Sequence, residues 1–259
     1  MSQFQRYIGI DYSGAATPTT SLKGLSVYSA TPTQPPAKVC PPLGFRKYWT
    51  RRGIAEWLAA ELHEGPPALV GIDHAFSFPL RYFEVHRIPH VWPAFLEDFH
   101  LHWPTDSDAM TVEFIRRGLY GSGASRLGDS RWRRLTELRS RAKSAFHFDV
   151  QGSVAKSTHA GLPWLLRLRR QLSQRVHFWP FDGWAPPAGR SVVAEIYPSL
   201  SSRNFPVEDR TPDQHDAYSV ARWMRERDAF EELNAYFHPK LSSAERVQAE
   251  TEGWILGMA

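Results

Sequence analysis

The sequence contains a single cysteine, Cys40, in 259 residues. One cysteine excludes an internal disulfide and any zinc site built from a cysteine cluster. No run of eighteen apolar residues occurs, and the first residues lack the basic, apolar and small-residue pattern of a secretion signal. The sequence therefore predicts a soluble protein of the cytoplasm that does not contact a membrane.

Signature motifs of several enzyme classes are also missing. There is no Walker loop, no nucleophile elbow and no dinucleotide fingerprint. The net charge of +4 and the isoelectric point of about 9.3 permit an anionic partner without requiring one. Hydrophobic residues form 42% of the chain, with ten tryptophans and fifteen phenylalanines, so a sizeable core is expected rather than disorder.

Two apolar stretches end on an aspartate. In GIDYSGA, the segment Phe4–Asp11 is rich in β-forming residues, and Gly14 supplies a turn signal after it. Leu69–Asp73, with the sequence LVGID, repeats the pattern sixty residues later. A carboxylate at the end of a buried strand is costly unless a cation or hydrogen-bond donors compensate it. Two such strands therefore predict a shared acidic site.

Periodicity divides the rest of the chain into a core and an insertion. The first 75 residues read as strand, strand, strand, helix and strand. The expected strands are Phe4–Asp11, Lys23–Ala30, a third near Val39 and Phe45–Trp49, and Leu69–Asp73, with a helix over Arg51–Glu64. Residues from about 80 to 190 favour helices over Ala94–His102, Asp108–Gly118, Arg131–Lys143 and Val154–Leu172. A strand over Ser191–Tyr197 and helices over Thr211–Arg225, Glu231–Phe237 and Ala244–Gly253 follow. We expect one domain over 1–259, with core segments 1–80 and 190–259.

The helix predicted after Thr211 carries two further acids. Thr211 and Gln214 have the spacing of a capping box, which marks the helix start. Asp213 and Asp216 lie three residues apart and therefore share a face. Asp216 lies one turn before Val220 in the apolar stripe, so we expect its side chain to point at the sheet.

Together the acids suggest a metal site. Asp11, Asp73, Glu195, Asp213 and Asp216 are the candidate ligands, and Asp11, Asp73, Glu195 and Asp216 the candidate catalytic residues. Mg²⁺ or Mn²⁺ suits a shell made only of carboxylates. Two such ions about 3.5–4 Å apart can activate water and stabilise a leaving oxygen in phosphodiester cleavage.

Each acid also has a structural interpretation. Asp11 can bond to the backbone of the turn that follows it, and Asp73 can end a strand or cap a helix. Glu195 can pair with one of the many arginines. Asp213 favours the dipole of its helix in the first turn, whatever else it does.

These segments resemble a known family. The motifs GIDYSGA, GIDHAFSFP, AEIYPS, DQHDAYSVARWM and EGWILG resemble domain-of-unknown-function family 429, which consists of predicted nucleases of the ribonuclease-H-like superfamily. The pair Asp213 and Asp216 is also similar to the closing acidic helix of Holliday-junction resolvases. The resemblance covers residues 1–80 and 190–257 and implies a mixed five-stranded sheet with flanking helices and a helical insertion. It places Asp11, Asp73 and Asp216 at the catalytic positions, and Glu195 at the strand glutamate.

A basic segment of the insertion is the candidate nucleic-acid track. Residues 116–143 contain nine basic side chains against Asp129 and Glu137. The candidate contacts are Arg116, Arg117, Arg131, Arg133 and Arg134. The alternative is a solvated helix face with ordinary ion pairs.

The histidines suggest two further roles. His86, His90, His100 and His102 lie close in sequence, but no cysteine or companion spacing supports zinc. His74 and His215 each adjoin a candidate acid, either as a proton shuttle or as an outward-facing neighbour.

The expected function is metal-dependent hydrolysis of a phosphodiester bond in nucleic acid, with Asp11 bridging two cations. Asp73 and Asp216 would each hold one cation, and Glu195 would bind metal or position the water. Two alternatives stay open. One is an actin-like phosphotransferase that binds a nucleotide and Mg²⁺. The other is a non-catalytic module of the same fold that binds nucleic acid or protein.

Overall fold

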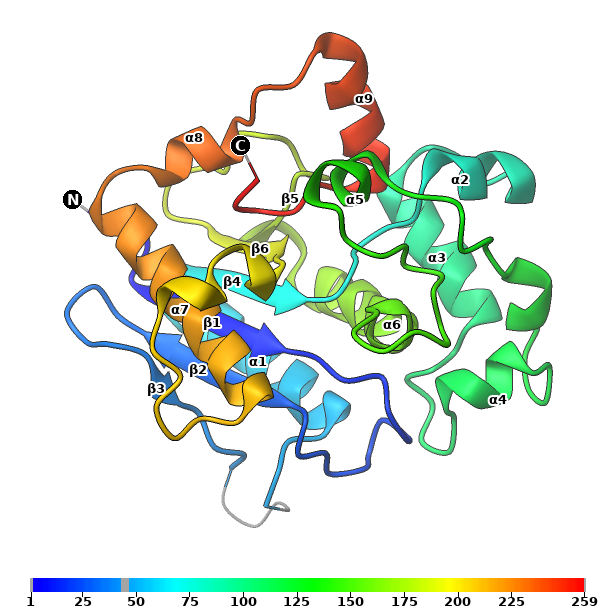
Figure 1. The fold of residues 1–259 in the computed structure, drawn as a ribbon, viewed down its shortest axis with the longest axis horizontal. Helices are drawn as coiled ribbons and strands as arrows, with labels where there is room; N and C mark the ends of the chain where they lie inside the picture. Colours follow the sequence, from blue (N-terminus) through cyan, green and yellow to red (C-terminus); the bar gives the residue numbers. More distant parts are fainter. Residues whose placement is uncertain (1, 43–46, 259) are drawn as a thin grey trace.

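The computed structural model describes residues 2–42 and 47–258, which form an α/β fold around a six-stranded mixed sheet. The strands are β1 (Arg6–Asp11), β2 (Ser26–Ala30), β3 (Ala37–Lys38), β4 (Ala68–Asp73), β5 (Val176–Trp179) and β6 (Ser191–Glu195). Their order is β3-β2-β1-β4-β6-β5. The first three strands pair antiparallel, and β1, β4, β6 and β5 run parallel to one another (Figure 1).

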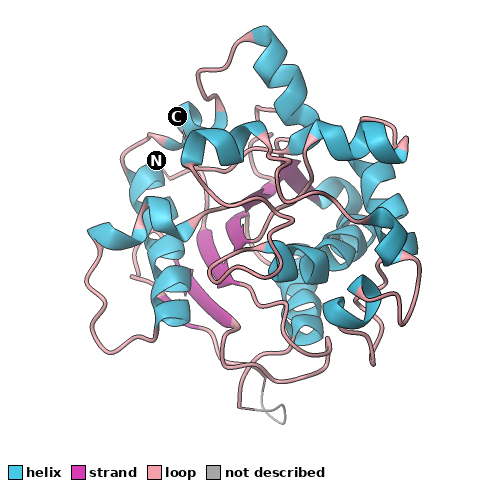
Figure 2. Ribbon diagram, turned by 45° about the vertical axis from the view of Figure 1, so that its right-hand side comes forward, coloured by secondary structure: helices cyan, strands magenta, loops and turns pink. Residues whose placement is uncertain are grey.

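Helices surround the sheet (Figure 2). The α-helices are α1 (Arg51–Glu64), α2 (Leu80–His86), α3 (Trp92–His102), α4 (Val112–Arg116), α5 (Leu135–Ser140), α6 (Ala155–Leu172), α7 (Pro212–Ala229), α8 (Leu233–Phe237) and α9 (Ser243–Glu252). Short 3₁₀ turns occur at Gly123–Arg126, Ser173–Arg175, Pro198–Leu200 and Ser202–Asn204. No helix in the described part of the chain is long and apolar enough to cross a membrane.

Successive side chains of β1 point to opposite faces of the sheet and pack into two cores, one on each face. Ile8 and Ile10 join the larger core, which also contains side chains of α1, α3 and α6. Tyr7 points to the opposite face, where Val220 and Met224 of α7 complete a second core. The sheet is therefore buried on both sides, which explains the nearly continuous apolar runs of β1 and β4.

Two glycines bring α7 close to the centre of the sheet. A Cβ atom on Gly9 would lie 2.2 Å from the carbonyl oxygen of Ala217, and one on Gly71 would lie 2.8 Å from Cγ1 of Val220. Both distances are too short for a real side chain. The glycines in the two strand motifs thus allow α7 to approach β1 and β4, which sets the position of the acids in its first turns.

The sheet has six strands rather than the expected five. The additional strand, β5, pairs parallel with β6 at the edge of the sheet and lies within the segment predicted as a helical insertion. The third strand is limited to Ala37–Lys38, because Pro41 and Pro42 cannot donate backbone hydrogen bonds. Part of the predicted stretch Phe45–Trp49 lies outside the described residues, and Tyr48 and Trp49 are not in a strand.

The helices agree with the sequence in the core and less well in the insertion. Helix α1 has the predicted bounds, and α7 begins as expected, with Thr211 and Gln214 each accepting the other's backbone N–H. In the insertion, the helices predicted over Asp108–Gly118 and Arg131–Lys143 shorten to α4 and α5. Helix α2 was not predicted, because its seven residues are too few to show a period.

Candidate acidic site

Asp11 and Asp73 lie side by side at the centre of the sheet. They end the neighbouring parallel strands β1 and β4, and the register pairs them directly with each other. The carboxyl ends of parallel strands meet at one edge of a sheet, which is where such folds usually place ligands. The predicted convergence of these two acids is therefore a property of the strand pairing.

Helix α7 adds Asp213 and Asp216 to this edge. Both charges act on Asp11 strongly enough to raise its pKa, which places the start of α7 near the end of β1. The capping box at Thr211 fixes where the helix begins, so that Asp213 falls in its first turn. Figure 1 shows α7 crossing the face of β1 and β2.

The pKa values of all four aspartates are raised, first by burial and, for Asp11, Asp73 and Asp216, also by neighbouring acids. Burial raises the pKa of Asp11 well above its usual range, and the charges of Asp73, Asp213 and Asp216 raise it further. Burial, Asp216 and Glu195 together raise the pKa of Asp73 to about 8. Burial also raises the pKa values of Asp213 and Asp216, against the opposing charges of Lys23 and His215 respectively. The group is therefore a partly buried excess of negative charge.

Within residues 2–42 and 47–258, none of these four carboxylates forms a hydrogen bond or an ion pair. An unpaired acidic group of this kind is stabilised by protons or by a cation. Oxygen ligands fit a hard divalent ion. The same residues contain no group of three or more His, Cys, Asp or Glu side chains arranged to hold a metal ion, so the carboxylates would have to turn toward a bound ion.

Glu195 already has a partner. Its Oε1 accepts from Nη2 of Arg134 at 2.6 Å, and its Oε2 accepts from Nη1 at 2.7 Å and from the backbone N–H of Phe76 at 3.1 Å. Arg134 also donates from Nε to Glu137 at 3.0 Å. All three charged side chains are buried. Glu195 thus pairs with an arginine, as in the structural interpretation of this residue. Its carboxylate is not free for a metal or a water.

The arginines of the predicted nucleic-acid track form contacts within the protein. Arg134 is 1% exposed, so the prediction that it contacts nucleic acid at the surface is wrong: it is a buried counter-ion. Arg116 pairs with Asp149, Arg117 with Glu113, and Arg131 with Asp129. Arg133 donates to the carbonyl oxygen of Ala142. These arginines therefore form the ordinary ion pairs and hydrogen bonds of the alternative interpretation.

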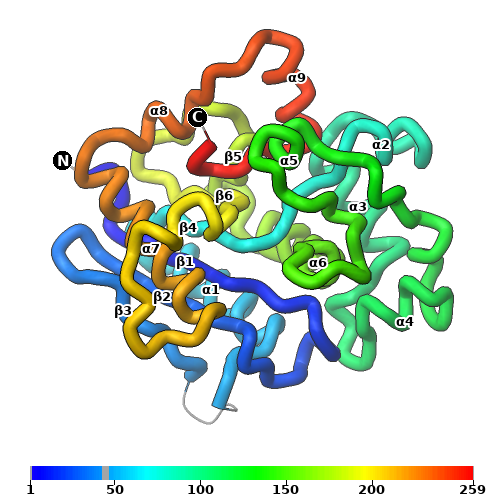
Figure 3. The backbone as a smooth tube through the Cα atoms, in the orientation of Figure 1, coloured from blue at the N-terminus to red at the C-terminus, as the bar shows by residue number. Residues whose placement is uncertain are grey.

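A buried arginine holds the loop that follows Asp11, a role that no sequence pattern indicates. Arg51, at the start of α1, donates to the carbonyl oxygens of Ser13, Ala15 and Ala16 at 3.2, 2.6 and 3.0 Å. On the other side of the loop, Gly14 packs against the first turn of α6. Figure 3 follows this loop from β1. Arginine patterns alone do not reveal such a role, because the partners are backbone carbonyls.

The histidines form contacts with neighbouring residues of the protein. His74 is buried and contacts Tyr12 and Phe76, and burial lowers its pKa to about 4. It is therefore not an outward-facing neighbour, and its lowered pKa favours the neutral imidazole near pH 7. Nε2 of His215 lies 3.0 Å from the carbonyl oxygen of Ser202. Of the four clustered histidines, His86, His100 and His102 contact Leu127, Asp106 and Asp98 respectively, and His90 packs edge-on against Phe83.

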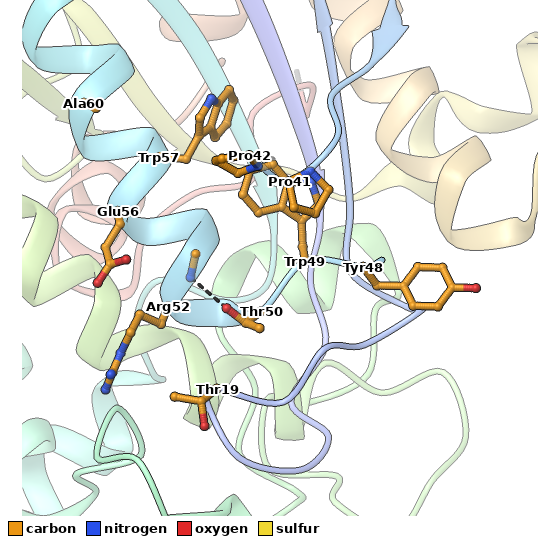
Figure 4. A pocket seen from close by; sticks show the side chains of 11 residues that line it. Thr19, Pro41, Pro42, Tyr48, Trp49, Thr50, Arg52, Glu56, Trp57 and Ala60 are labelled. Atoms are coloured by element: carbon orange, nitrogen blue, oxygen red, sulfur yellow. Dashed lines mark hydrogen bonds between the residues drawn. The ribbon is translucent and has the colours of Figure 1, made fainter. Parts of the chain in front are cut away.

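Two cavities differ in their relation to the acids. One of about 20 Å³ is lined by Asp73, Glu195 and Arg134, and by Lys143 and Gly152 of the insertion. A larger one of about 480 Å³ lies beside the start of α1 and is lined by Trp49, Trp57 and two prolines, with none of the candidate acids (Figure 4). The insertion therefore closes over Asp73, whereas the roomy aromatic cavity is separate.

Comparisons of the chain with protein-family models, with curated proteins and with solved structures find no match. The resemblance described above stays a prediction that rests on the motifs alone.

Proposed function

We propose that the protein is a metal-dependent nuclease that hydrolyses phosphodiester bonds at the edge of the sheet where β1 and β4 end. The observation that carries the proposal is the direct pairing of Asp11 with Asp73, which Asp216 approaches from α7. Among the described residues these carboxylates have no counter-ion. A site that concentrates unpaired acids is costly for folding, and such a cost is typical of functional sites.

The three acids have distinct positions in this proposal. Asp11 pairs with Asp73 in the sheet and lies near the start of α7, so in this proposal it holds a cation jointly with either neighbour. The charge of Asp216 acts on both Asp11 and Asp73, and Asp213 is the more exposed member, near Lys23. Mg²⁺ or Mn²⁺, when bound, would neutralise the phosphodiester and activate a water molecule.

Glu195 has a supporting role in this proposal, different from the role of metal ligand or water-positioning residue expected from the sequence. Its carboxylate binds the backbone N–H of Phe76, three residues after Asp73, while Arg134 neutralises its charge. Glu195 therefore fixes the segment that leaves β4, and with it the position of Asp73. Its charge also helps to raise the pKa of Asp73.

Cleavage of a labelled panel tests the proposal. The panel contains single-stranded and double-stranded DNA, RNA, a hybrid duplex and a four-way junction, each with Mg²⁺, Mn²⁺ or EDTA. We expect metal-dependent cleavage by the wild type and a loss of at least about 100-fold in Asp11→Asn, because that change removes a charge that the cation requires.

Asp149→Asn is the matched control, because Asp149 is a surface acid whose side chain is 74% exposed and pairs with Arg116. It should cleave like the wild type. Equal cleavage by Asp11→Asn and the wild type would contradict the proposal. Absence of cleavage by a folded wild type would favour the non-catalytic module.

A further inference from the structure

None of the described lysines forms an ion pair, whereas most of the described arginines do. Every ion pair found within residues 2–42 and 47–258 uses an arginine or a histidine as the cation, and none uses a lysine. The described lysines are Lys23, Lys38, Lys47, Lys143, Lys156 and Lys240, and all are exposed. Three of the six, on three different segments of the chain, lie close to parts of the acidic site.

Lys143 adjoins the site from the insertion. It lines the small cavity that also contains Asp73 and Glu195. Its ammonium group donates to the carbonyl oxygen of Gln151, a contact that leaves its charge unneutralised. The side chain is exposed, so it can exchange this single hydrogen bond for one to an anion.

Lys23 adjoins the site from the connection between β1 and β2. Its charge lowers the pKa of Asp213, which places it within electrostatic range of that carboxylate without an ion pair. The next residue, Gly24, faces Asp213: a Cβ atom on it would lie 3.7 Å from Oδ2. Lys23 therefore lies next to Asp213, the acid in the first turn of α7.

Lys156 lies in the first turn of α6, against the loop that follows Asp11. A Cβ atom on Gly14 would lie 2.0 Å from the carbonyl oxygen of Lys156, so the two backbones are in close contact. Its charge helps to lower the pKa of Asp149, which Arg116 already binds at 2.8 and 2.5 Å. Its ammonium group is exposed and has no ion-pair partner in the described part of the chain.

We propose that Lys23, Lys143 and Lys156 bind the backbone phosphates of a single-stranded nucleic acid around the acidic site. This inference rests on the proposed nuclease function and names its substrate form and contacts. Exposed ammonium groups are strongly hydrated point charges that suit phosphates without reading bases. An acidic site repels a polyanion, so cations around it are needed to hold a strand there.

The residues that line the cavity beside Asp73 favour a single-stranded nucleic acid. Ala142, Lys143, Gly152 and Val154 of the insertion line the cavity next to it, and only about 20 Å³ is free there. A flexible strand can bend between these residues and the loop after β1. A duplex is stiff, with a persistence length of about 50 nm, and would have to deform to reach the same carboxylates.

Binding without cleavage tests the inference. The experiment measures fluorescence anisotropy of a labelled 20-nucleotide single-stranded DNA with Asp11→Asn protein, in EDTA, at 50–300 mM KCl. The test variant adds K23Q, K143Q and K156Q. The matched control adds K38Q, K47Q and K240Q, which remove the same charge elsewhere.

We expect the test variant to lose at least tenfold in affinity at 100 mM KCl. The slope of log affinity against log salt should fall by about 2, since each single-strand phosphate contact contributes about 0.7. The control should stay within about twofold of the parent, and an unlabelled duplex of the same sequence should compete poorly. Thermal melting of both variants checks that they are folded.

An equal loss in the control would overturn the inference, because general charge would then explain binding. An unchanged test variant or preferred binding of the duplex would also overturn it. The result of this test can be told apart from that of the nuclease test. If the lysine substitutions weaken binding but the wild type cleaves no substrate, only the nuclease proposal is refuted. If the wild type cleaves but the lysine substitutions do not weaken binding, only this inference is refuted.

Discussion

Arg134→Met is expected to lower the free energy of unfolding by about 3–5 kcal/mol, because it leaves the buried carboxylates of Glu195 and Glu137 without a cation. Arg134 donates to both, at 2.6–3.0 Å, and also to the carbonyl oxygen of Glu252 at 3.3 Å. Methionine fills much of the volume of the arginine side chain. The loss of stability therefore reports the removal of the charge more than a loss of packing. Urea unfolding followed by circular dichroism gives the value.

Two further variants make this result specific. Arg131→Met removes an arginine from an exposed pair with Asp129 and should change stability little. Adding Glu195→Gln to Arg134→Met removes one of the stranded charges and should recover part of the loss. A loss no larger in Arg134→Met than in Arg131→Met would contradict the assignment of Arg134 as the central counter-ion.

Asp73→Asn is expected to stabilise the metal-free protein at pH 8. The folded-state pKa of Asp73 is raised to about 8, and an unfolded aspartate has a pKa of about 3.9. The carboxyl group therefore contributes stability that is fully present below pH 4 and is lost as the pH rises toward 8. The loss proceeds at up to about 1.4 kcal/mol per pH unit. Asparagine stays neutral, so the variant lacks this loss.

Thermal melts from pH 4 to pH 8 in EDTA measure the effect. We expect the wild type to lose stability relative to Asp73→Asn throughout this range, with the largest difference at pH 8. Asp149→Asn should follow the wild type, because Asp149 lies on the surface. If the melting temperatures of the wild type and Asp73→Asn change with pH in the same way, the raised pKa of Asp73 is contradicted.

The core of the fold and the acids on it could be predicted from local patterns. The strand ends at Asp11 and Asp73 and the start of α7 follow from apolar runs and a capping box, which are short-range signals. Parallel pairing then brings Asp11 and Asp73 together. For this reason the central part of the acidic site was accessible from the sequence.

The partners of the charged side chains could not be predicted in the same way. Glu195 and Arg134 are 61 residues apart and meet only because the insertion folds back over the end of β6. Arg51 is bound by carbonyl groups, which every sequence contains. Strand β5 was missed because four residues inside a helical, arginine-rich region give no clear alternation. Long-range contacts of this kind depend on the complete fold.

The most direct test of the account is a calorimetric titration of Mn²⁺ into the metal-free protein at pH 7.5, in two buffers that differ in ionisation enthalpy. If the acids form a cation site, the wild type binds Mn²⁺ and releases up to about one proton per site, because a cation displaces the proton of Asp73. Asp11→Asn and Asp73→Asn should bind far more weakly and release none. Binding by these variants as tight as that of the wild type, or no binding by the wild type, would contradict the account.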